Sequence, residues 1–187
     1  MRTFFCLNLP NAIQEQMHRV AKDIKTNTNV KWVNPTNLHV TLKFLGDIDR
    51  EDVSNIRGAA ERTVQDIPDF ELQVDKLGAF PNKSYPKVIW LGTTQAPEEI
   101  FQLQSKLERE LEPLGFEPED RDYVPHTTLG RTKDDRNQKI KTLGEEISSY
   151  QLEDSWKVSV ETLTFMESKL KPTGPVYSQV FDLAFGS

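Results

Sequence analysis

The chain has 187 residues, which is enough for one domain or for two small lobes that share an interface. Its net charge of −6 argues against sequence-independent binding along a nucleic-acid duplex but allows a small nucleotide site with a few local cations. The single cysteine, Cys6, excludes an intramolecular disulfide. No signal-peptide pattern and no apolar run of the roughly 20 residues needed to span a membrane is found, so we expect a cytoplasmic protein.

Strand and helix patterns alternate in the first half of the chain. Residues 2–9 are apolar on both faces, which predicts a central strand, and apolar residues at helical spacing follow from Pro10. Residues 38–45 predict a second strand, and Asp49 can cap the helix after it. Residues 70–77 and 87–92 predict two further strands, separated by a loop over 78–86.

The second half continues this alternation. A third helix is predicted after Pro97, a strand over 123–129, and a polar helix with a thin apolar side over 134–150. Residues 156–166 and 176–184 predict the last two strands, joined by a turn at 171–175. Because no linker is long enough to divide the chain, we expect a single α+β domain over residues 1–187.

One short pattern, His-x-Thr-Leu, occurs twice, at residues 39–42 and 126–129. Two of the three histidines in the chain begin it, and the two copies lie 126 − 39 = 87 residues apart, close to half the length. Each copy falls on a predicted strand that a helix follows. The spacing therefore predicts an ancient duplication, with two lobes that each present one motif strand to a shared cleft.

The residue types in this pattern suit acid–base chemistry on a phosphate ester. Residues i and i+2 of a strand face the same side, so His39 projects with Thr41 and His126 projects with Thr128. One imidazole can donate a proton while the other accepts one, and each hydroxyl can donate a hydrogen bond to a phosphoryl oxygen.

Three further residues near the motifs are candidates for substrate contact. Lys43 has the parity of the motif face, where it is either a phosphate ligand or a solvated lysine. Arg131 has the opposite parity, and a bulge at Gly130 would be needed to turn it toward the phosphate. Phe80, on its predicted loop, is the better candidate for stacking on a base, because Phe44 has the parity of the core.

A zinc site is the main alternative for paired histidines, but it needs three or four ligands at recognisable spacing, and the sequence has none. Threonine is also a poor zinc ligand. No glycine-rich phosphate loop or nucleophile elbow is found either. The third histidine, His18, lies off the apolar stripe of its helix and is expected at the surface, and Cys6 is expected to be a buried, inert thiol.

The two motifs and several other stretches resemble the 2H phosphoesterase superfamily, and within it the RNA 2′,3′-cyclic phosphodiesterases, also called 2′-5′ RNA ligases. The resemblance covers nearly the whole chain. Its matching stretches are residues 32–46, 77–81, 88–92, 125–131, 167–170 and 174–177.

This resemblance implies a bilobal fold, in which two pseudo-symmetric antiparallel-sheet lobes with outer helices enclose a central cleft. It also implies hydrolysis of a 2′,3′-cyclic phosphate at an RNA 3′ end to a 2′-phosphate, with no metal or other cofactor and with minor ligase activity at most. In the family's pattern His39 is the proton donor, His126 is the proton acceptor, and Thr41 and Thr128 stabilise the phosphoryl oxygens.

Two other functions stay open at this stage. The substrate could be a different small cyclic phosphate, such as a cyclic nucleotide or an ADP-ribose cyclic phosphate. The same cleft could also hold RNA ends or nucleotides without catalysis. We expect a monomer with no obligate protein partner and no membrane association.

Overall fold

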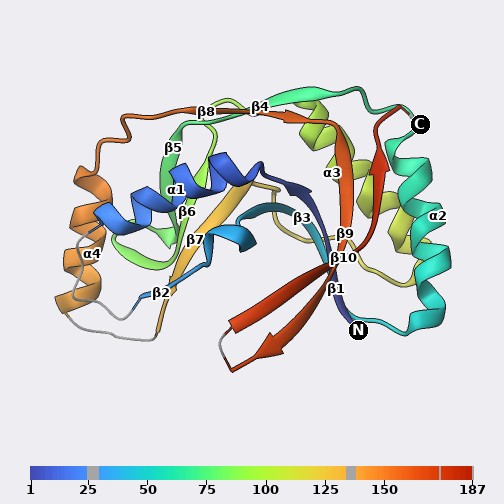
Figure 1. Ribbon diagram of the computed structural model, residues 1–187, viewed down its shortest axis with the longest axis horizontal. Coiled ribbons are helices and arrows are strands. Elements are labelled where there is room, and N and C mark those ends of the chain that lie inside the picture. The colour runs from blue at the N-terminus through green and yellow to red at the C-terminus, as the bar shows by residue number, and fades with distance from the viewer. Residues whose placement is uncertain (25–29, 134–137, 173, 187) are drawn as a thin grey trace.

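Two four-stranded antiparallel sheets form the frame of the computed structural model, which describes residues 1–24, 30–133, 138–172 and 174–186 (Figure 1). The first sheet has the order β10-β9-β1-β3. Its strands are β1 (Arg2–Asn8), β3 (His39–Asp47), β9 (Thr162–Lys171) and β10 (Gly174–Ala184). As predicted, β1 is central, and its residues 3–7 are all buried.

The second sheet has the order β2-β7-β6-β5. Its strands are β2 (Val30–Trp32), β5 (Lys76–Asn82), β6 (Tyr85–Gly92) and β7 (His126–Thr132). A separate two-stranded sheet pairs β4 (Phe70–Val74) with β8 (Trp156–Val160), and Figure 1 shows it crossing above the space between the two larger sheets.

Four helices in the described part of the chain cover the outer faces of the sheets (Figure 1). They are α1 (Asn11–Asp23), α2 (Val53–Val64), α3 (Glu98–Leu111) and α4 (Gln138–Ser149). The pair α2 and α3 packs on the first sheet, while α1 and α4 pack on the second. This arrangement confirms the expected two lobes with outer helices, because each lobe consists of a sheet covered by two helices. Three short 3₁₀ turns complete the structure, namely η1 (Pro35–Asn37), η2 (Arg50–Asp52) and η3 (Glu112–Leu114).

The structure corrects three of the predicted segments. The strand expected over 70–77 is divided, because β4 ends at Val74 and β5 begins at Lys76 in another sheet. The loop expected over 78–86 is a tight hairpin, because β5 continues to Asn82 and β6 begins at Tyr85. Gly78 does not make a turn there. It allows the indole of Trp90 to lie against the strand, since a Cβ at Gly78 would meet that ring. The strand expected over 156–166 is two strands, β8 and β9, separated at Glu161.

Two predicted segments extend past the described residues. The polar helix expected over 134–150 is described from Gln138 onward, and residues 134–137 lie outside the description. The turn expected at 171–175 includes residue 173, which also lies outside it.

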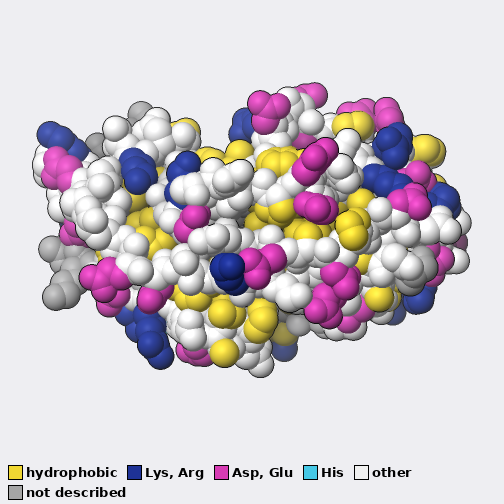
Figure 2. Space-filling model, turned by 90° about the horizontal axis from the view of Figure 1, so that it is seen from above, with side chains coloured by type: hydrophobic (Ala, Val, Ile, Leu, Met, Phe, Trp, Pro, Cys, Tyr) yellow, Lys and Arg dark blue, Asp and Glu magenta, His cyan; other side chains and the backbone are white. Residues whose placement is uncertain are grey.

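Acidic and basic side chains are interspersed on the face seen from above, with apolar atoms between them (Figure 2). In the part of the chain that the structure describes, no helix is both long and apolar enough to pass through a membrane.

Candidate active site

The two His-x-Thr-Leu motifs lie on β3 and β7, and both strands bulge at the same point of the motif. On β1, the neighbouring residues Cys6 and Phe5 pair with Thr41 and Lys43, which leaves Leu42 as the extra residue of β3. In the same way, Trp90 and Ile89 pair with Thr128 and Gly130, which leaves Leu129 as the extra residue of β7. Both extra leucines are buried. The bulge is therefore a shared feature of the two lobes.

Each bulge shifts the alternation of side chains by one residue, so the residues after it change face. In the second lobe Arg131 turns to the cleft side, where it lines a cavity together with His39. The bulge that Arg131 needs to face the cleft is therefore present, with Leu129 and not Gly130 as its extra residue. Gly130 itself serves a close approach, since a Cβ there would meet the side chains of Trp32 and Val30.

In the first lobe the same shift reverses the two predictions for residues 43 and 44. Lys43 was expected on the motif face, yet it is only 3% exposed, and its Nζ donates to Glu108 Oε2 at 2.5 Å and to the Glu117 carbonyl at 2.7 Å. Phe44 was expected in the core, yet it is 58% exposed and its ring lies 5.7 Å from that of Phe4. Lys43 therefore supports the strand from behind and cannot bind a phosphate in the cleft.

The two imidazoles are held by equivalent backbone contacts. Nδ1 of His39 lies 2.7 Å from the carbonyl oxygen of Asn37, and Nδ1 of His126 lies 2.7 Å from that of Val124. A carbonyl only accepts, so each neutral ring carries its proton on Nδ1 and has an unprotonated Nε2. Nε2 of His39 lies 3.0 Å from the hydroxyl oxygen of Thr41, so the His-x-Thr pair meets as its spacing predicts.

Aromatic rings enclose both histidines. The ring of Phe4 stacks on His39 with 4.9 Å between centroids, and Tyr177 contacts the same imidazole edge-on at 5.3 Å. In the second lobe the Phe80 and Trp90 rings lie 5.0 and 5.9 Å from that of His126. The prediction that Phe80 belongs to the site is thus compatible with its position, although it lies on β5 and not on a loop.

The two motif strands are also joined directly. The phenol of Tyr123, three residues before His126, donates a hydrogen bond of 2.9 Å to the backbone carbonyl of Thr41. Because β3 is the edge strand of its sheet, this bond satisfies a carbonyl on the side where no further strand pairs. Sequence analysis did not identify this link between the two motifs.

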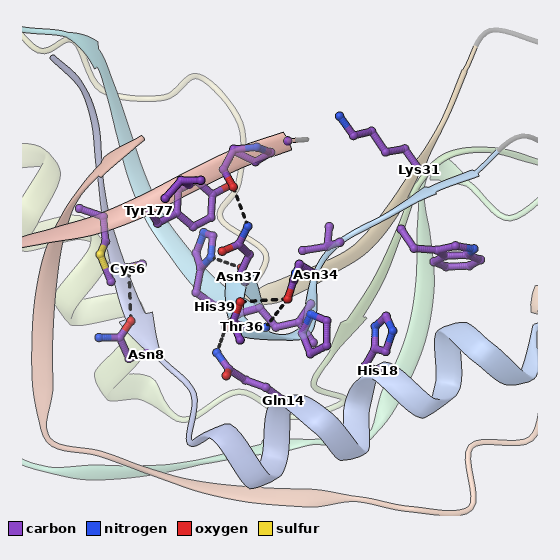
Figure 3. Close-up of a pocket in the computed structure, with 18 of the residues that line it drawn as sticks. Cys6, Asn8, Gln14, His18, Lys31, Asn34, Thr36, Asn37, His39 and Tyr177 are labelled. Atoms are coloured by element: carbon purple, nitrogen blue, oxygen red, sulfur yellow. Dashed lines mark hydrogen bonds between the residues drawn. The ribbon is translucent and has the colours of Figure 1, made fainter. Parts of the chain in front are cut away.

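A cavity of about 870 Å³ opens beside His39, between the second sheet and the β9–β10 hairpin (Figure 3). Figure 3 shows His39, Asn37 and Tyr177 at one side of it and Lys31 and His18 at the other. The amide of Asn37 donates to the Pro175 carbonyl at 2.9 Å, which ties the turn before His39 to the hairpin. Cys6 is buried as expected and lies at the cavity wall, whereas His18, expected at the surface, is half-buried and lines the cavity.

Burial changes the proton affinity of both imidazoles. It lowers the pKa of His39 to about 4, the hydrogen bond to the Asn37 carbonyl opposes this shift, and the charge of His126 adds to it. Burial also lowers the pKa of His126, against the effect of the Val124 carbonyl and with that of the Arg131 charge. Both shifts favour the neutral imidazole at pH 7.

Folding stability should depend on pH through His39. An unfolded histidine has a pKa near 6.5, so below that pH the unfolded chain binds a proton that the folded chain takes up only near pH 4. Stability is then fully present above pH 6.5 and falls as the pH decreases toward 4. We expect His39 to account for a loss of about 2 kcal/mol in unfolding free energy between pH 7.5 and 5.

Urea unfolding of wild type and His39→Gln at these two pH values measures this contribution, because the other titrating groups are common to both. A wild-type chain that loses no more stability than the variant would contradict it.

Within the described residues, no group of three or more His, Cys, Asp and Glu side chains is placed to hold a metal ion. The groups that the site does present are two imidazoles, two threonine hydroxyls and one guanidinium, and all of these can interact with a phosphodiester.

Comparison with known proteins matches two successive parts of the chain, residues 7–90 and 91–177, to the family described as LigT like Phosphoesterase. This chain belongs to the LigT-like phosphoesterase family. The two matched parts contain one motif each, so the predicted duplication agrees with the family's own repeat.

Curated LigT-like relatives cover the full length. An RNA 2′,3′-cyclic phosphodiesterase of Methanothermobacter thermautotrophicus is 35% identical, over 96% of each chain. The enzyme of the same name in Methanocaldococcus jannaschii is 32% identical, over 96% of this chain and 98% of the relative. Among solved structures, LigT of E. coli complexed with 3′-AMP superposes with a TM-score of 0.82 and 26% identity, over 100% of this chain and 98% of that one. The bilobal fold implied by the sequence is thus confirmed.

Proposed function

We propose that this LigT-like phosphoesterase hydrolyses the 2′,3′-cyclic phosphate at an RNA 3′ end to a 2′-phosphate. The observation that carries the proposal is the pair of His-x-Thr units, each with an Nδ1 anchored on a carbonyl and therefore an unprotonated Nε2. Relatives that match 96% of the chain at 32–35% identity are named RNA 2′,3′-cyclic phosphodiesterases, which supports this substrate.

In the proposed reaction His126 accepts a proton from water, and the water oxygen attacks phosphorus. The bond between phosphorus and the 3′ oxygen breaks, and His39 donates a proton to that leaving oxygen. The product carries a 2′-phosphate and a free 3′-hydroxyl. Each proton transfer of this kind contributes about 10²- to 10⁴-fold in rate.

The donor role requires a protonated His39, although its pKa is about 4 in the empty cleft. A bound phosphodiester carries a negative charge, which favours the charged imidazolium and raises that pKa. Thr41 and Thr128 donate hydrogen bonds to the non-bridging oxygens, and Arg131 forms a bidentate contact with the phosphate. The substrate thus creates the protonation state that its own hydrolysis needs.

Two aromatic rings beside the histidines are proposed contacts for the terminal nucleoside. Phe80 lies against His126, and the exposed Phe44 lies beside the Phe4 ring that stacks on His39. Stacking of a base on such a ring contributes about 1–3 kcal/mol and tolerates different bases.

The test compares substrates at equal concentration. A short RNA ending in a 2′,3′-cyclic phosphate should be hydrolysed, whereas 3′,5′-cyclic AMP and an ADP-ribose cyclic phosphate should be hydrolysed at least about tenfold more slowly. Faster turnover of either small molecule would assign a different substrate. Binding of the RNA without any turnover would show a non-catalytic binding module.

A further inference from the structure

The wall of the 870 Å³ cavity differs in charge from the rest of the molecule. The chain as a whole carries −6, yet the described residues that line the cavity include no Asp and no Glu. They include two permanent cations, Lys31 and Arg131, and two histidines, His18 and His39. A concave wall with this composition attracts anions. The low dielectric constant of the protein interior behind the wall strengthens the positive potential in the cavity.

Lys31 and Arg131 form a pair across two strands. They are direct partners in the register of β2 and β7, so their Cα atoms lie about 5 Å apart and their side chains share one face. No carboxylate among the described residues forms an ion pair with either side chain. Both cations are exposed and therefore available to a ligand.

The order of these cations along the cleft indicates what each one contacts. Arg131 is close enough to His126 for its charge to lower the pKa of that imidazole, so it belongs beside the reacting phosphate. Lys31 lies one strand farther out, and Figure 3 shows it across the cavity from His39. The Lys31 amine is therefore placed to contact a second phosphate, next to the reacting one along the RNA chain.

Trp32 lies on the other face of β2. It pairs with Gly130, and its ring packs there beside Val30, whereas Lys31 shares the face of Arg131 because successive residues of a strand alternate. The second cation is therefore the group that this part of the cavity offers to a ligand. The cavity volume is near the upper end of the about 300–1,000 Å³ of small-ligand sites, which leaves space beyond the reacting group.

We infer that Lys31 forms a subsite for the penultimate nucleotide of an RNA substrate, where it contacts the phosphate that joins the last two nucleotides. The inference rests on the proposed function, since a 2′,3′-cyclic phosphate closes the 3′ end and the chain continues only through the 5′ oxygen of the last ribose. The subsite makes the enzyme prefer an oligonucleotide end to a free nucleoside cyclic phosphate.

The test uses two substrates with the same reacting nucleoside, uridine 2′,3′-cyclic phosphate and the dinucleotide ApU ending in a 2′,3′-cyclic phosphate. Lys31→Gln should lower kcat/KM for the dinucleotide by about three- to fivefold, as expected for one exposed charge contact, and leave the value for the mononucleotide unchanged. The slope of log kcat/KM against log salt for the dinucleotide should decrease by about 0.7. Lys31→Arg should retain the preference.

Lys157→Gln is the matched control, because it removes an exposed lysine from β8, which does not line the cavity. An equal effect of Lys31→Gln on both substrates, or no effect on the dinucleotide, would overturn the subsite while the proposed function stands. Wild-type enzyme that hydrolyses neither substrate would overturn the proposed function, and the subsite with it.

Discussion

Replacement of His39 or of His126 by alanine is expected to lower kcat for cyclic-phosphate hydrolysis by about 10²- to 10⁴-fold in each case. Each imidazole is held by a hydrogen bond to the carbonyl two residues before it and is therefore positioned for proton transfer. In the alanine variants, neither water nor a neighbouring side chain takes over this transfer. The two roles belong to one reaction, so the double variant should be little slower than the slower single variant.

The pH dependence of kcat distinguishes this role from a merely structural one. Wild type should give a bell-shaped profile with one limb from each imidazole, and each alanine variant should lose one limb. Urea unfolding at pH 7.5 checks that the variants remain folded. Variants that are folded, retain both limbs and lose less than about tenfold in kcat would show that the histidines do not transfer protons.

Replacement of Lys43 by methionine is expected to destabilise the fold by about 3–5 kcal/mol. The Lys43 and Glu108 side chains are 2% and 10% exposed, and the pair joins β3 to α3 behind the first motif. Methionine has a side chain of similar length but leaves the Glu108 carboxylate buried without its cation. The remaining hydrogen bond from Gln104 to Glu108 does not compensate for that lost charge.

Urea unfolding of wild type, Lys43→Met and the double variant Lys43→Met/Glu108→Leu measures this effect. The double variant should recover most of the loss, because it buries no unpaired charge. Lys157→Met is the matched control, since the Lys157–Glu71 ion pair is exposed on both sides and is worth about 0–1 kcal/mol. A loss in Lys43→Met as small as in this control would contradict a structural role for Lys43.

The contact between His39 and Thr41 was predictable because it depends on local spacing. His39 and Thr41 face one side of a strand at i and i+2, and the structure places them in contact. The alternation of helices and strands also predicted the two lobes, since each motif strand is followed by a helix that covers its own sheet.

The residues after each motif could not be placed by alternation alone. A bulge at Leu42 exchanges the faces of Lys43 and Phe44, and apolar alternation carries no sign of an extra residue. One signal was available, because the bulge predicted for Arg131 in the second motif has its counterpart in the first. If both copies had been treated alike, Phe44 would have been predicted in the cleft.

Contacts between distant segments could not be predicted from the sequence either. Lys31 and Arg131 are 100 residues apart in number and meet only because the short edge strand β2 pairs with β7. Three residues are too few to give a strand pattern, so β2 was not predicted. Likewise, Gly78 signalled a loop, whereas its lack of a side chain makes room for Trp90 within a hairpin.

The most direct test of the account is to incubate the wild-type protein with a short RNA ending in a 2′,3′-cyclic phosphate, with EDTA present, and to resolve the product as a 2′- or a 3′-phosphate. Two-histidine hydrolysis predicts turnover that EDTA does not reduce and a product with only a 2′-phosphate. A 3′-phosphate product would show that the other bond is broken, and turnover abolished by EDTA would show a metal-dependent reaction. Either result would contradict the mechanism.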